Sequence, residues 1–68
     1  MNYVLKIKRQ QSSGTVITLA TQRMSRSTTE AQAIAHAELI VKTRPQAIVE
    51  ILVDEGGLGL VGPIHVTR

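Results

Sequence analysis

The most apolar stretch of the chain is Ala47-Ile48-Val49-Glu50-Ile51-Leu52-Val53. Both of its alternating sets of residues are apolar except at Glu50. A strand that is apolar on both faces is typical of the middle of a sheet, where each face is covered. We therefore expect residues 47–53 to form a central strand, with the other segments arranged around it.

The residues that follow this strand predict a hairpin. Asp54-Glu55-Gly56-Gly57 has the composition of a tight turn, and residues 58–66 then return as the last strand. Pro63 lies within this last strand and cannot donate a ladder hydrogen bond. We therefore expect residues 58–66 to lie at a sheet edge or to be bulged.

A helix is predicted before the central strand, over residues 28–43. Ser27-Thr28-Thr29-Glu30 fits a capping box with Ser27 as the N-cap, and Pro45 disfavours helical backbone at Arg44. At 100° per residue the helix has one apolar face, rich in alanine, that predicts a close approach to a sheet. Its members are Ala33, Ile34, Ala37, Ile40 and Val41.

The N-terminal part predicts a second hairpin. Tyr3, Leu5 and Ile7 alternate with Val4, Lys6 and Lys8, residues 10–14 have a turn composition, and residues 15–21 are rich in β-branched side chains. The predicted fold class is α+β, in the order β-β-α-β-β. We expect one antiparallel-rich, four-stranded sheet with the helix packed on one face, and a single small domain over residues 1–68.

The composition predicts that a single copy has little core. The chain has 68 residues, no cysteine and one aromatic residue, Tyr3. A chain of this length buries only about 60% of the surface that its unfolded form exposes. Because no disulfide can stabilise it, oligomerisation is the expected remedy.

The sheet face away from the helix is a candidate interface. If Tyr3 and its alternating partners face the helix, an apolar patch remains on the other side, formed by Val4, Ile48, Leu52 and Val61. We expect His65 to lie on this face as well. A second copy or a protein partner would cover such a patch. The alternative is that the last strand folds over this face and makes a partly closed barrel.

The charge is unevenly distributed along the sequence. Residues 1–29 carry five Lys or Arg and no acid, whereas residues 30–68 carry three Lys or Arg and five acids. The candidate contacts to nucleic acid or another anion are Lys6, Lys8, Arg9, Arg23 and Arg26. A two-stranded ribbon can enter the major groove of duplex DNA, but base stacking needs exposed rings and Tyr3 is expected to face inward. Alternatively, the basic surface is only solvated or meets the acidic half of another copy.

No pattern in the sequence indicates catalysis. Residues 57–62 match GxGxxG, but the helix that this motif needs to hold a pyrophosphate cannot follow within the six remaining residues. His36 and His65 lack ligand spacing, and we expect both at the surface, with His36 on the solvent side of the helix. Asp54 and Glu55 are typical solvated turn residues. We predict no catalytic residues, no metal site and no cofactor.

The sequence therefore predicts a small non-catalytic interaction module that is homodimeric and acts by protein–protein binding, as an adaptor or inhibitor. The alternative is a protein associated with duplex DNA that contacts the phosphate backbone through its basic N-terminal hairpin. Lysines interrupt the apolar run at the N-terminus before a signal peptide could form, and no apolar stretch approaches membrane length. We accordingly expect a cytoplasmic protein with no membrane partner.

Overall fold

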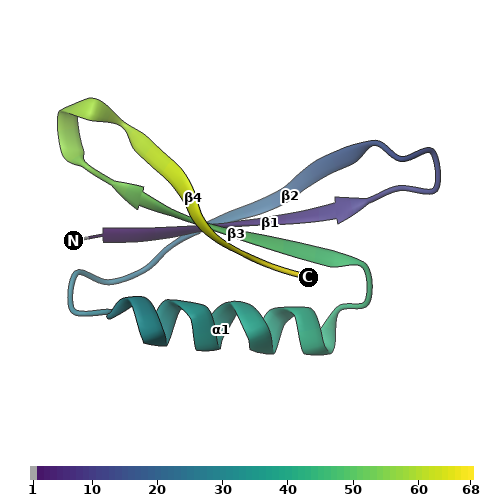
Figure 1. Ribbon diagram of the computed structural model, residues 1–68, viewed down its shortest axis with the longest axis horizontal. Coiled ribbons are helices and arrows are strands. Elements are labelled where there is room, and N and C mark those ends of the chain that lie inside the picture. Colours follow the sequence, from purple (N-terminus) through teal and green to yellow (C-terminus); the bar gives the residue numbers. More distant parts are fainter. Residues whose placement is uncertain (1) are drawn as a thin grey trace.

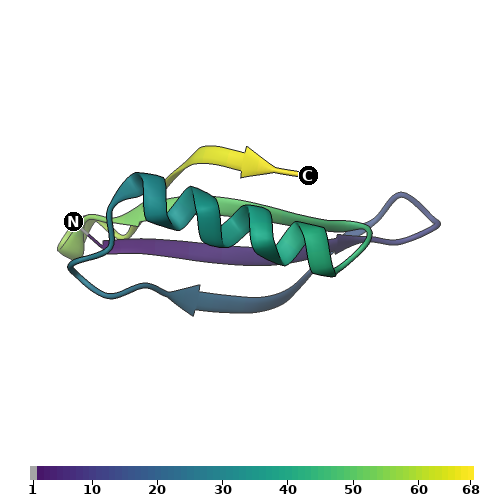
Figure 2. The ribbon, with the colours of Figure 1, turned by 90° about the horizontal axis from the view of Figure 1, so that it is seen from below.

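A computed structural model describes residues 2–68 and shows four strands and one α-helix. The elements are β1 (Asn2–Gln10), β2 (Val16–Arg23), α1 (Glu30–Thr43), β3 (Ala47–Asp54), the 3-10 turn η1 (Gly56–Leu58) and β4 (Leu60–Thr67). The strands form one antiparallel sheet in the order β2-β1-β3-β4, and α1 packs on one face (Figures 1 and 2). The predicted α+β class and β-β-α-β-β order are confirmed.

The most apolar strand, β3, is central as predicted, with β1 and β4 as its neighbours. β4 lies at an edge and is irregular, as Pro63 indicates. Ile51 pairs with His65 and Val53 with Val61, so three residues, 62–64, lie between the two partners on β4. A regular ladder would have one residue there. Gly62 has a φ of 129°, and a Cβ at this position would lie 2.8 Å from the backbone nitrogen of Ile64, so the bulge requires glycine.

The helix begins two residues later than predicted. Thr29 is the N-cap, and its hydroxyl accepts a hydrogen bond from the backbone N–H of Gln32 at 3.2 Å. In return, the backbone N–H of Thr29 donates to the side-chain oxygen of Gln32 at 2.9 Å. The assignment of Ser27 as the N-cap is therefore wrong: Thr29 and Gln32 form a second capping box within the same segment. The helix ends at Thr43, before Pro45.

The core lies between α1 and the sheet. Tyr3, Leu5 and Ile7 of β1 face the helix, which confirms the predicted alternation and the inward position of the only aromatic ring. Ala33 and Ala37 are the fully buried residues of α1, so the backbone of the helix approaches the sheet closely. The remaining buried core residues are Val49, Ile51 and Val53, and partly buried Met24, Ile34, Ile40 and Val41 pack against the cluster.

The helix does not cover the whole sheet. Figure 2 shows α1 crossing β3 and β1, with β2 to one side. All eight residues of β2 are exposed. The apolar contacts of the core therefore involve mainly the two central strands, and both edge strands remain open to further contacts.

Candidate interaction surface

We call the sheet face opposite α1 the open face. Val4, Lys6 and Lys8 of β1 lie on it, because they alternate with the core residues of that strand. Ile48, Glu50 and Leu52 of β3 lie on it for the same reason, which confirms the predicted positions of Ile48 and Leu52. Directly opposite residues in antiparallel strands share a face, so the register adds residues from the two edge strands. These are Arg23 opposite Val4, Val66 opposite Glu50 and Leu60 opposite Asp54.

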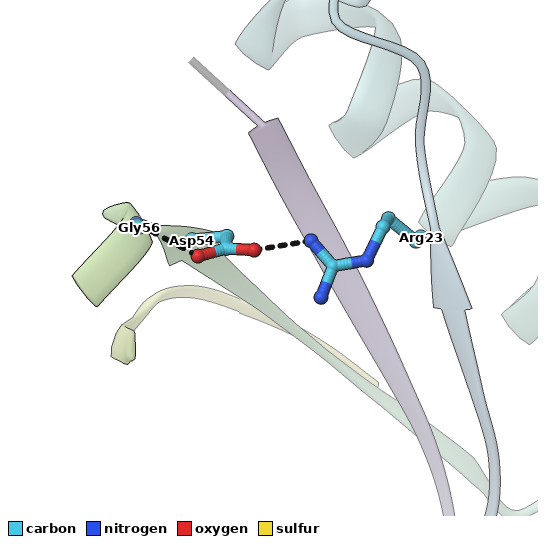
Figure 3. Close-up of polar contacts among 3 residues, drawn as sticks. All are labelled: Arg23, Asp54 and Gly56. Carbon is cyan, nitrogen blue, oxygen red and sulfur yellow. Dashed lines mark hydrogen bonds and ion pairs between the residues drawn. The ribbon is translucent and has the colours of Figure 1, made fainter. Parts of the chain in front are cut away.

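The centre of the open face is already covered within one chain. Val4 and Leu52 lie opposite each other and are only 1% and 7% exposed. The side chain of Arg23 crosses β1 on this face, and its guanidinium donates a hydrogen bond to the carboxylate of Asp54 (Figure 3). This ion pair joins β2 to β3 over the strand that carries Val4. The two predicted interface residues at the centre are therefore not free to contact a partner.

Electrostatic contacts hold the carboxylate of Asp54 in its ionised form. The hydrogen bond from Arg23 has the largest effect, and the backbone N–H of Gly56 donates to Oδ1 at 2.9 Å. Both lower the pKa of Asp54 below its ordinary value, because hydrogen bonds to a carboxylate favour the charged form. Asp54 thus links β2, β3 and the turn after β3 (Figure 3).

A second ion pair lies on the open face. The Nζ atom of Lys8 is 2.9 Å from Oε1 of Glu50, its diagonal neighbour on β3. Lys6 lies directly opposite Glu50. The structure thus places Lys8 and Arg23, two of the five predicted anion contacts, in ion pairs with acids from the second half of the sequence.

The five predicted cations do not form one surface. Lys6 and Lys8 lie on the open face, whereas Arg9 pairs with Ile17 and Ala47 near the end of β1. Arg26 lies in the connection between β2 and α1, at the opposite end of the sheet. The prediction of a basic ribbon therefore does not correspond to one continuous patch.

Two predicted positions on the open face are wrong. Val61 pairs with Val53, and His65 pairs with Ile51, so both lie on the side of the helix. The bulge adds two residues to β4, so the alternation of this strand is the same before and after it, and the register that pairs Val61 with Val53 sets which positions face outward. Ile64 precedes His65 and lies on the open face by alternation.

The exposed apolar surface of the open face therefore lies on β4, and we call Leu60, Ile64 and Val66 the β4 strip. These side chains are 40%, 43% and 41% exposed, and half-buried Ile48 lies nearby on β3. β2 and β4 are opposite edges of the sheet, so the predicted alternative of a partly closed barrel is not observed. The open face is apolar along β4, whereas β1 and β2 carry basic and hydroxyl side chains there together with exposed Val16 at the start of β2.

The structure also corrects the environment of His36. Its side chain is half-buried, and its Nε2 atom lies 3.3 Å from the side-chain oxygen of Gln22 on β2. Across residues 2–68, no group of three or more His, Cys, Asp or Glu side chains is arranged to hold a metal ion. Within the same residues, no helix has the length and apolar character needed to cross a membrane.

Sequence reasoning missed the β4 strip and the role of Asp54. The faces of β4 depend on its register against β3, in which Leu60 pairs with Asp54, and alternation along β4 alone does not determine that register. Asp54 was interpreted only as a turn residue, since its partner lies 31 positions away. Comparisons with protein families, with curated proteins and with solved structures found no match for this chain.

Proposed function

We propose that the protein is a small non-catalytic interaction module that acts by protein–protein binding as a homodimer. The observation that carries this proposal is the β4 strip. Its three large apolar side chains lie on one face of one edge strand, and each is at least 40% exposed. Contiguous exposed apolar surface of this kind marks contact sites in proteins of this size.

A second copy is the partner that best fits the strip. The strip itself carries no charge, and the neighbouring acids Glu50 and Asp54 are each paired within the chain. Two copies related by a two-fold axis would therefore bring no unpaired like charges together at the strip. Packing two open faces together would add the sheet-to-sheet core that a short chain with one aromatic residue lacks.

The test compares two substitutions on the same strand. Ile64→Asp places a charge on the open face, whereas Val61→Asp places the same charge on the helix side, and each parent side chain is 43% exposed. We expect light scattering after gel filtration to give a dimer for the wild type and for Val61→Asp. Ile64→Asp should dissociate, with a dimer Kd raised roughly 100-fold or more, because an unpaired carboxylate would be buried.

A wild-type monomer at high protein concentration would refute the proposal. Equal dissociation of both variants would also refute it, since the effect would then not depend on the open face. Circular dichroism must show the same helix content for all three proteins. Leu52→Asp is unsuitable as a test because Leu52 is buried within a single chain, so a charge there would unfold the protein.

Binding to duplex DNA through the N-terminal hairpin is the second candidate. Lys6 supports it, because it lies on the basic part of the open face and takes no part in the two ion pairs found among residues 2–68. The pairing of Lys8 and Arg23 weakens it. If this surface binds DNA, the affinity for a duplex should fall steeply as the salt concentration rises, and the double variant Lys6→Glu, Lys8→Glu should not bind. Absence of such binding would eliminate this candidate and leave the homodimer proposal unaffected.

A further inference from the structure

Three arginines from separate segments meet at one end of the molecule. Arg9 lies near the end of β1 and pairs with Ala47, the first residue of β3. Arg44 precedes β3 in the turn after α1, and Arg68 follows Thr67, which pairs with Val49. Figure 1 shows the β1–β2 hairpin, the turn after α1 and the C-terminal end of β4 at this same end. We call these three residues the arginine end.

Two adjoining concavities bring these side chains together. The larger, of about 840 Å³, is lined by Arg9 and Arg68, and the smaller, of about 410 Å³, by Arg9 and Arg44. Arg9 and Ala47 line both, so the two concavities are neighbours. Among residues 2–68, no Asp or Glu lines either one. The larger also has hydrogen-bonding side chains from Ser12 and Gln46.

The charges at this end are not neutralised within the described chain. The two ion pairs found among residues 2–68 use Lys8 and Arg23, not the three arginines. Of the acids on β3 and in the turn after it, Asp54 and Glu55 lie at the other end of the strand, and Glu50 is paired with Lys8. Positive charges gathered without an acid create a local potential that attracts multiply charged anions.

We infer that the arginine end binds phosphate groups. Each guanidinium presents a planar fork of donors that matches two oxygens of a phosphate, and three of them suit a ligand with more than one phosphate. The hydroxyl and amide side chains of the larger concavity add donors of lower charge. This inference does not rest on the homodimer proposal, because it uses none of the β4 strip.

Titration with inorganic tripolyphosphate, followed by amide chemical shifts at constant ionic strength, tests the inference. We expect saturable shifts confined to residues 9–13, 44–48 and 68. The double variant Arg9→Gln, Arg44→Gln should weaken binding at least tenfold, and Arg68→Gln should weaken it several-fold. Arg26→Gln is the matched control, since Arg26 is an exposed arginine at the opposite end of the sheet, and it should leave binding unchanged.

Several results would overturn the inference. These are shifts that do not saturate, equal shifts with sodium chloride of the same ionic strength, or an equal loss of binding in Arg26→Gln. A parallel titration with a short DNA duplex identifies the source of the phosphate. Duplex binding that depends on Arg9 and Arg44 indicates a nucleic-acid backbone, whereas binding of tripolyphosphate alone indicates a small phosphorylated molecule.

Discussion

Replacing Ala37 with leucine tests whether alanine sets the distance between α1 and the sheet. Ala37 is 0% exposed and faces the core formed by β1 and β3. Leucine would add three carbon atoms where the helix backbone already contacts the sheet. Because interiors are packed as densely as organic crystals, the added atoms can be accommodated only if the helix moves away or neighbouring side chains leave their rotamers.

The expected cost is large for a domain of this size. Overpacking of a filled core costs about 1–3 kcal/mol. Folded domains are stable by roughly 0.05–0.15 kcal/mol per residue, or about 3–10 kcal/mol for a chain of this length. At about 4–8 °C per kcal/mol, the Tm of Ala37→Leu should fall by at least about 4 °C.

The assay is thermal and urea unfolding followed by circular dichroism, at one fixed protein concentration because dimerisation would add to stability. Ala35→Leu is the matched control: it makes the same change at an exposed position of the same helix and should stay within about 0.5 kcal/mol of the wild type. If Ala37→Leu were as stable as the wild type, with well-dispersed amide resonances, the alanine face would not determine how closely the helix packs.

Two further substitutions test particular contacts. Because the pKa of Asp54 is lower in the folded protein than in the unfolded chain, its ion pair with Arg23 stabilises the fold fully above about pH 4. This stabilisation is lost as the pH falls through the pKa of Asp54 in the folded protein. Asp54→Asn should therefore flatten the acid side of the stability profile in urea titrations, whereas Glu55→Gln should retain it; equal flattening would assign the effect to general charge. Gly62→Ala should destabilise by roughly 1–3 kcal/mol because of its positive φ and the backbone nitrogen 2.8 Å from the new Cβ. Gly57→Ala has open space and should be nearly neutral in thermal unfolding, and an equal effect at both positions would contradict this reading.

The elements of the fold could be predicted because their signals are local. Alternation over residues 3–9 identified β1 and its inward face, and the spacing of Ala33 and Ala37 identified the buried side of α1. The start of the helix could not be fixed in this way. Ser27 and Thr29 each begin a capping pattern, with Glu30 and Gln32 three residues further on, and only the packing of the helix selects between them.

The face of β4 could not be predicted because it depends on the register of this strand against β3, which the length of the preceding turn sets. In the structure Leu60 pairs with Asp54 and Val61 with Val53, and this register places Val61 on the helix side. The bulge at Gly62-Pro63 adds two residues, so the same alternation continues to Ile64 and His65. The candidate interface therefore moved from the centre of the sheet to its edge.

The charge surface depends on topology rather than on position along the chain. Counting by halves places the positive charge in the N-terminal hairpin, but β1 pairs with β3 and brings Glu50 and Asp54 onto the face that carries Lys8 and Arg23. The same pairing leaves Arg9 beside the turn that contains Arg44, at the other end of β3 from Asp54 and on the other face of the sheet from Glu50. Ion pairs offset the charges of Lys8 and Arg23, whereas neither ion pair found among residues 2–68 involves the three arginines. Phosphate affinity should therefore depend on the three arginines and not on the lysines of β1.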